Sequence, residues 1–256
     1  MPGTVLVAVQ WAAPANEATV APDGGLDWSR ARSSIGEYDQ VAIEVGRTLA
    51  DGLGAVLVAV GVGGQDAASS LAIKAAASRG VDRVVVVLDE APSTVGVAAA
   101  LAAQTGVEQD VRAVVLGDSS VDHATTMVAP VLAGLLGLPV LTDVRQVTPD
   151  GDDLQVVHTV SGAREVVAVS GPVVLAVAAD AAVPRVPGMR DILAAAKKPS
   201  TVVTASDLGV TPAHAARTRS RVRIDPPDRR RHVIREDDPT VAAQRLVTEL
   251  VEEGVL

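Results

Sequence analysis

The chain has 256 residues, a formal net charge of -9 and no cysteine. Its length suits one large or two small domains, and the missing thiols exclude disulfides, thiolate metal sites and a cysteine nucleophile. The acidic charge and an aromatic content of 1% argue against nucleic-acid binding, while the lack of a long apolar run or a basic leader predicts a cytoplasmic protein.

The first half of the chain alternates strand-like runs with helix-like segments. Thr4–Val9 is typical of a buried strand. Ser34 stands three residues before Glu37, which predicts a capping box and a helix that ends near Gly52 or Gly54. This alternation predicts a doubly wound, mostly parallel α/β sheet. The other segments are a polar stretch at residues 12–33, strands at 56–60, 84–88 and 111–116, and helices at 66–79 and 94–105.

Residues 111–139 form the unit around which we expect a ligand site. An apolar run at its start is long enough only for a strand buried on both faces, and a helical-period run follows a polar loop. Because Pro130 has no N–H, the helix can hardly begin before about Thr125 or Thr126, so residues 117–124 form a loop over the carboxyl end of the strand. Free helix N–H groups at this position favour an anion such as a phosphate.

Side chains near this loop leave alternatives open. Four hydroxyl groups could hold a phosphate together with backbone N–H groups, or they could cap the following helix. Trp11, at the end of the first strand, could stack on a ring or pack against the polar stretch that follows it. The four hydroxyl residues are Ser119, Ser120, Thr125 and Thr126.

The same loop contains Ser120, Asp122 and His123, which are close in sequence. Such closeness does not orient a base toward a nucleophile as a catalytic triad requires. The four histidines of the chain show no metal-ligand spacing. We therefore predict neither catalytic residues nor a metal site.

The second half of the chain follows a different pattern. Turn signals at residues 149–151 and 161–162 predict an antiparallel hairpin that extends the sheet before another strand at residues 173–177. A loop and a short helix then lead to Lys197-Lys198-Pro199, and apolar periodicity is lost until residues 240–253. We expect an α/β domain over residues 1–198 and an extended C-terminal arm with a terminal helix over residues 199–256.

Several short motifs occur in the order typical of one known family. By these motifs the chain, from Val5 to Leu256, resembles the beta subunit of electron transfer flavoprotein (ETF). The resemblance implies an adenine nucleotide alpha hydrolase-like α/β fold. The motifs are V-L-V-A-V at 5–9, G-x-x-x-x-D at 117–122, P-R at 184–185, K-K-P at 197–199, D-L-G-V at 207–210 and P-P-x-R at 226–229.

The resemblance implies an electron carrier rather than an enzyme. A beta subunit of this kind pairs with an alpha subunit that holds most of the FAD, and it binds AMP or a second FAD itself. The heterodimer accepts electrons from a dehydrogenase and passes them to a quinone reductase or another acceptor. The alternative is a stand-alone adenine-nucleotide-binding sensor with the same α/β layout, and a hydrolase comes third.

Residue-by-residue transfer from the family places the nucleotide at strand ends, at a helix start and on the polar loop. The implied contacts are Ala8, Ser33, Ser34, Ile35, Gly36, Val62, Gly117, Asp118, Ser119, Ser120, Val121, Asp122, His123, Ala124, Thr125, Thr126, Met127 and Val128.

The chain departs from the family pattern at several of these positions. A carboxylate at Asp118 near a phosphate costs Coulomb energy, and Met127 cannot make the hydrogen bonds of an amide. The choice between AMP, a second FAD and no nucleotide therefore stays open. The departures are Gln10-Trp11 for Lys-Arg, Ser33-Ser34-Ile35 for Asn-Pro-Phe, Asp118 for Lys, Met127 for Gln and Ala129 for Gly.

A docking loop is implied for residues 178–189. In the family a leucine of this loop enters an apolar pocket of the dehydrogenase, and Met189 takes its place here, where it could also pack against the helix that follows. Arg185 and Arg190 suit the rim of such a contact. Because Val186 replaces an aromatic residue and Arg190 a proline, we expect a partner other than the usual acyl-CoA dehydrogenase.

Arginines are concentrated in the expected arm. Few acidic residues accompany them and no aromatic residue is interleaved, so we expect them to meet an acidic surface of the alpha subunit rather than RNA. They are Arg217, Arg219, Arg221, Arg223, Arg229, Arg230, Arg231 and Arg235.

Overall fold

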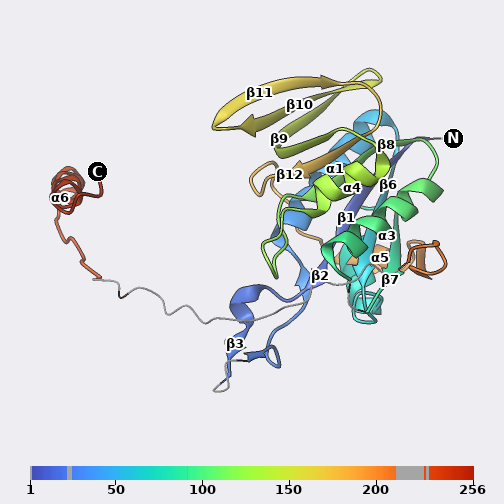
Figure 1. Cartoon of the computed structure of the whole chain (residues 1–256), viewed down its shortest axis with the longest axis horizontal. Helices are drawn as coiled ribbons and strands as arrows, with labels where there is room; N and C mark the ends of the chain where they lie inside the picture. The colour runs from blue at the N-terminus through green and yellow to red at the C-terminus, as the bar shows by residue number, and fades with distance from the viewer. Residues whose placement is uncertain (1, 22–24, 91, 212–227, 229–230) are drawn as a thin grey trace. The chain divides into compact units, whose positions relative to one another are not determined.

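A nine-stranded sheet forms the centre of the larger part of the protein, which ends at Arg217 (Figure 1). The structure, a computed structural model, describes residues 2–21, 25–90, 92–211, 228 and 231–256. Its contacts divide the chain into two units, Met1–Arg217 and Thr218–Leu256. The strand order is β11-β10-β9-β12-β8-β1-β6-β7-β13. The strands are β1 (Thr4–Val9), β6 (Val56–Gly63), β7 (Arg83–Leu88), β8 (Val111–Gly117), β9 (Val140–Asp150), β10 (Asp153–Val160), β11 (Ala163–Val169), β12 (Val173–Val177) and β13 (Ser200–Thr204).

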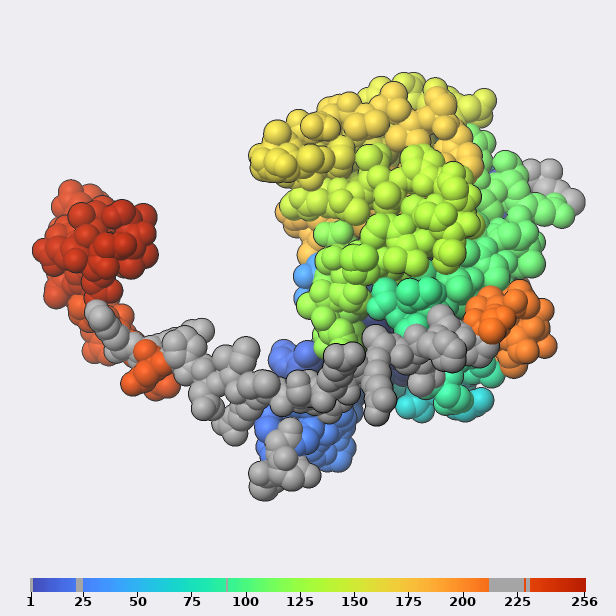
Figure 2. Space-filling view, viewed as in Figure 1, coloured from blue at the N-terminus to red at the C-terminus, as the bar shows by residue number. Residues whose placement is uncertain are grey.

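Seven neighbouring strands, from β9 to β13 in this order, pair in parallel, and only the β9-β10-β11 edge is antiparallel. In the space-filling view that edge (yellow) forms one end of the larger unit (Figure 2). The predicted doubly wound, mostly parallel α/β sheet with an antiparallel extension is therefore confirmed.

Helices cover both faces of the sheet, as a doubly wound fold requires. The helices α1 (Glu37–Leu53), α2 (Ser70–Ala77) and α5 (Met189–Ala195) pack on one face, and α3 (Thr94–Val107) and α4 (Val128–Leu136) pack on the other. Strand residues alternate between the two cores: Val5 and Val7 face α1, while Leu6 faces α3 and α4. Each central strand is thus buried on both sides, which explains its continuous apolar sequence.

The predicted capping box at the start of α1 is wrong. The N-cap of this helix is Gly36, which has no side chain to accept a hydrogen bond, and Glu37 is the first helical residue. Ser34 instead belongs to the short strand β5 (Ser34–Ile35), where it pairs with Ala12 of β2 (Trp11–Ala12). This extended pairing holds Ser34 two residues away from the cap position.

The helix expected over residues 66–79 is shorter than predicted. Residues 64–69 form successive turns, and α2 begins at Ser70 because the Ser69 side chain caps it by accepting a hydrogen bond from Ala72 N. The start of α4 agrees with the limit set by Pro130, since this helix begins at Val128.

Two strands of the central sheet were not predicted. β9 contains Asp143, which has a φ of +48°, and its pairing with β10 has a register shift. These irregularities interrupt the regular alternation of side chains by which a strand is recognised in a sequence. β13 is largely exposed and pairs in parallel with β7, so it lacks the apolar run of a central strand. β13 lies beyond residue 198, where the arm was expected to begin. Small paired strands, β3 (Thr19–Val20) and β4 (Leu26–Asp27), and a 3-10 turn at Ala15–Glu17 occupy the polar stretch.

The second unit contains α6 (Pro239–Glu252), which matches the predicted terminal helix. The P-P-x-R motif and most of the arginine cluster fall outside the described residues; Arg231 and Arg235 fall inside them. Within the described ranges no helix has the length and apolar character needed to cross a bilayer.

Candidate functional site

A cavity of about 500 Å³ lies at the carboxyl ends of β1, β6 and β8, on the side of the sheet that α3 and α4 cover. β1 is the neighbour of both β6 and β8, but the chain leaves β1 toward α1 on one face and leaves β8 toward α4 on the other. Ligands of open α/β sheets bind at such a switch point. The predicted loop after β8 forms one wall of this cavity.

The structure brings many of the predicted contact residues together around this cavity. Its lining includes Ala8, Val62, Gly117, Asp118, Ser119, Ser120, Asp122, His123, Thr125, Thr126 and Val128. The residues Ser33, Ser34, Ile35, Gly36, Val121, Ala124 and Met127 do not belong to it.

Some residues outside the lining support the loop from behind. A Cβ atom on Gly36 would lie 2.5 Å from Cγ1 of Val121, so the start of α1 packs closely against the loop. Ile35 is only 4% exposed and pairs with Trp11. Trp11 itself packs partly against the core and also lines the cavity.

The loop is held by its own hydrogen bonds. Ser120 N donates to Thr125 O at 3.1 Å, and Thr125 N donates to Ser120 Oγ at 3.1 Å. Ala124 closes this turn with φ +50°. Met127 is the N-cap of α4 and supplies no side-chain cap. The N–H groups in the first turn of a helix have no hydrogen-bond partner within the helix. In α4 they include those of Val128 and Ala129, and both residues line the cavity.

Gly117 permits a close approach between the end of β8 and the start of α1. A Cβ atom at this position would lie 2.6 Å from Cβ of Tyr38 and 3.1 Å from Oδ1 of Asp39. This approach brings Asp39 to the cavity wall, although sequence reasoning did not select Asp39. The signal available was an acidic residue in the first turn of the helix that follows the first strand.

Three carboxyl groups line the cavity. Burial raises the pKa of Asp39 to about 7. The hydrogen bond that its Oδ2 accepts from Gln10 N at 2.8 Å lowers the pKa, but by less than burial raises it. Burial also raises the pKa of Asp118. For Asp122, burial acts in the same direction, but hydrogen bonds from Ser120 and His123 together outweigh it and lower the pKa. None of the lining residues that the structure describes is a lysine or an arginine.

His123 does not form a triad. Its Nδ1 lies 3.0 Å from Oδ2 of Asp122, and its side chain is 79% exposed. The Ser120 hydroxyl accepts a hydrogen bond from Thr125 N and donates to the Asp122 carboxylate. In the parts of the chain that can be described, no three His, Asp or Glu side chains are grouped so that they could hold a metal ion.

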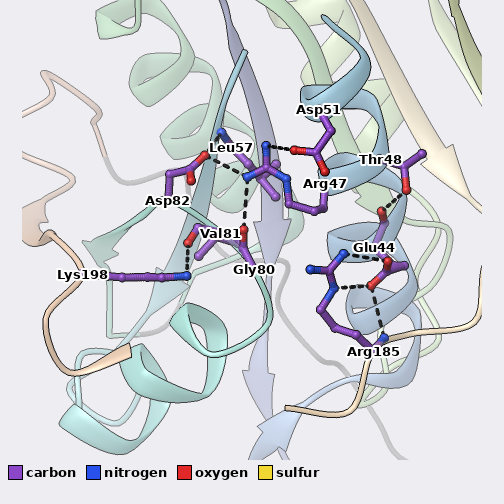
Figure 3. A network of polar contacts seen from close by, with 10 residues as sticks. All are labelled: Glu44, Arg47, Thr48, Asp51, Leu57, Gly80, Val81, Asp82, Arg185 and Lys198. Carbon is purple, nitrogen blue, oxygen red and sulfur yellow. Dashed lines mark hydrogen bonds and ion pairs between the residues drawn. The ribbon is translucent and has the colours of Figure 1, made fainter. Parts of the chain in front are cut away.

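The implied docking segment is fixed to the body of the protein by Arg185 (Figure 3). Its Nε and Nη2 atoms donate to Oε2 and Oε1 of Glu44, on α1, at 2.7 and 2.8 Å, and its backbone N donates to the same carboxylate. The guanidinium lies over Gly80, where a Cβ atom would be 2.7 Å from Nη1. Arg185 is therefore an internal anchor of the segment as well as a partly exposed cation.

The end of α5 is anchored in a similar way. Lys198 Nζ donates to the carbonyl groups of Ala77 and Val81 at 2.9 and 2.7 Å (Figure 3 shows the second contact). Between these anchors, Met189 begins α5 with 73% of its surface exposed, and Arg190 is exposed beside it. Other apolar side chains of the segment are exposed as well: Val183, Val186, Ile192 and Leu193.

A comparison with protein families shows a match over most of the chain. The family model described as electron transfer flavoprotein domain matches residues 25–208. This range contains most of the central sheet, the loop after β8 and the segment between Arg185 and Lys198. The match does not separate beta from alpha subunits.

Proposed function

The chain belongs to the electron transfer flavoprotein family, and on that premise we propose that it is the beta subunit of a heterodimeric electron carrier. In this proposal an alpha subunit holds most of the FAD. The heterodimer accepts electrons from a dehydrogenase and passes them to a quinone reductase or another acceptor. The observation that carries the proposed electron transfer is the family match, because it extends through most of the sheet, the cavity loop and the segment between Arg185 and Lys198. The choice of the beta subunit rests on the order of the sequence motifs.

The proposed role as beta subunit is supported by the loop after β6. A dinucleotide-binding fingerprint needs a third glycine that lets the following helix pack closely on the strand. Here Gly61, Gly63 and Gly64 are followed by turns before α2 begins at Ser70. This loop is therefore poorly suited to an FAD pyrophosphate, which agrees with a partner subunit as the main holder of the flavin.

The cavity at the end of β1 is the proposed site of a bound nucleotide, either AMP or a second FAD. Its volume of about 500 Å³ lies in the range of small-molecule sites. The Trp11 side chain could cover a flat ring, and the first turn of α4 offers backbone N–H groups.

The segment between Arg185 and Lys198 is the proposed docking surface for a dehydrogenase, with Met189 as its anchor. An exposed, unbranched apolar side chain on a fixed segment suits insertion into an irregular pocket. Arg190 would lie on the rim of the contact, and Arg185 would both hold the segment and contribute charge.

Purification of the tagged full-length chain from its native host tests the proposal. We expect a second subunit with its own ETF domain in 1:1 ratio, together with flavin absorbance. A chain that purifies alone, carries an adenine nucleotide and lacks flavin would contradict the carrier and support the stand-alone sensor. HPLC of the ligand released from the complex would identify the nucleotide.

A further inference from the structure

The charge around the cavity is the starting point. Asp39 comes from α1, while Asp118 and Asp122 come from the loop after β8, and all three line the same space. Gln10 holds two of them side by side: its backbone N donates to Asp39, and its Nε2 donates to Asp122 Oδ2 at 2.8 Å. The carboxyl groups are therefore fixed at the wall by direct hydrogen bonds.

Positive charge in the lining is much weaker than this negative charge. The described lining contains no lysine or arginine, and the ring of His123 is mostly exposed and paired with Asp122. The start of α4 contributes roughly half an elementary charge through its N–H groups. In a partly desolvated site, that partial charge cannot balance both a phosphate dianion and the carboxylate of Asp122, whose pKa is lowered by its hydrogen bonds.

The remaining features suit an uncharged ligand. Apolar side chains from three strands and two helices make up much of the wall and leave room for a flat ring next to Trp11. Carboxylates accept hydrogen bonds, so they pair with the hydroxyl and amino groups of a ligand without opposing charge. The apolar lining residues include Val9 of β1, Val60 and Val62 of β6, Leu116 of β8, Val97 and Leu101 of α3, and Ala129 of α4.

We propose that this cavity binds an uncharged nucleoside-class ligand, whose hydroxyl or amino groups donate to the carboxylates, and that it discriminates against the phosphorylated form. The inference rests on the proposed carrier but replaces the AMP or second FAD proposed for the same cavity by a ligand without a phosphate. It assigns to Asp118, which directly follows β8, a role in selecting the ligand without a phosphate. Asp118 N is fixed to Val177 O at 3.0 Å, which holds its backbone next to β12.

Calorimetry with adenosine and AMP tests this inference, because the two probes differ only in the phosphate. With the purified full-length complex at pH 7.5, adenosine should bind at least tenfold more tightly than AMP. Asp118→Lys should raise the affinity for AMP about tenfold or more and change that for adenosine less than threefold. Asp153→Lys is the matched control, since Asp153 is exposed at the start of β10 and does not line the cavity; it should leave both affinities unchanged.

Asp118→Asn provides a second variant, because its side-chain oxygen can keep the hydrogen bond from the backbone of Asp143. It should raise AMP affinity several-fold without a new positive charge. Equal or tighter binding of AMP by the wild-type complex, or no binding of adenosine at millimolar concentration, would overturn the inference. Neither result affects the proposed carrier, which depends on the flavin and the partner subunit and is tested by their co-purification.

Discussion

Asp39 lies in the first turn of α1, and its carboxyl group links the cavity to the stability of the fold. Burial raises its pKa from 3.8 to about 7, so the folded chain keeps this proton over a pH range in which the unfolded chain has lost it. Between about pH 4 and pH 7 the unfolded state therefore binds fewer protons, and the free energy of unfolding falls as the pH rises. At pH 8 the ionised carboxylate remains in a partly desolvated place.

Asp39→Asn should remove this dependence. The amide oxygen can still accept the hydrogen bond from Gln10 N, but the side chain no longer ionises. Because one pKa unit corresponds to about 1.4 kcal/mol, the variant should gain on the order of 4 kcal/mol relative to wild type between pH 4 and pH 8. Urea denaturation without ligand at both pH values measures the effect. The same pH profile in variant and wild type would show that Asp39 ionises freely in the folded protein.

The origin of Asp39's position also shows what sequence could not predict about the site. The loop 117–128 was found because a strand, a polar stretch and a proline-limited helix follow one another in sequence. Asp39 was missed because an acidic residue in a first helical turn is normally solvated. The close approach of Gly117 to Tyr38, which links residues distant in sequence, is what brings Asp39 to the cavity wall.

At the scale of elements, local signals located the central strands and the β10-β11 hairpin but missed β9 and β13. Strands buried on both faces are recognisable by continuous apolar runs, as in β8 and β12. β13 is defined by its pairing with β7, which is distant in sequence, and its exposed side chains carry no strand-specific signal. The capping-box prediction failed for a similar reason, because pairing with β2 determines the conformation of Ser34.

The proposed docking segment is fixed at both ends, by Arg185 on Glu44 and by Lys198 on two carbonyl groups. The backbone around Met189 is thus held at both ends, so a partner loses less backbone entropy when Met189 binds to it. Truncating a buried interface anchor costs about 2 kcal/mol or more. Met189→Ala should therefore lower the rate of reduction by the cognate dehydrogenase by roughly tenfold or more, with flavin content and heterodimer assembly unchanged. Stopped-flow reduction of the purified heterodimer measures this rate.

Val107→Ala is a matched control for this variant. Val107 is 62% exposed at the end of α3, which packs on the other face of the sheet from α5. Its truncation should leave the reduction rate unchanged. If Met189→Ala keeps the full rate, or loses flavin together with activity, Met189 is not the anchor.

At the scale of the whole molecule, the proposal that an alpha subunit holds the FAD leads to a prediction about flavin binding by the isolated chain. The glycines after β6 lack a dinucleotide fingerprint, so the chain alone should bind FAD weakly. The isolated chain should purify nearly colourless and become part of a yellow complex only with its alpha partner. Absorbance in the flavin bands after gel filtration measures the stoichiometry. One FAD per isolated chain would contradict the prediction and favour a carrier of the electron-bifurcating type.

The terminal helix α6 is the part of the molecule that most needs a partner. Its residues include several exposed apolar side chains, with Leu246 at 49% and Val247 at 52%, and none of its residues is buried. An amphipathic helix of 14 residues is marginal in water on its own, so contact with another surface is expected to stabilise it. We expect that surface to belong to the alpha subunit.

Leu246→Asp should test this contact, because it places a charge on the apolar stripe that a partner would desolvate. The variant should weaken heterodimer assembly at least tenfold. It should leave the melting temperature of the larger unit unchanged, because α6 belongs to the other of the two compact units. Gln244→Asp is the matched control: it adds the same charge two residues away, on a different side of the helix. Analytical ultracentrifugation of the tagged pair measures the dissociation constant. Equal assembly by Leu246→Asp and Gln244→Asp would mean that the apolar stripe of α6 does not contact the partner.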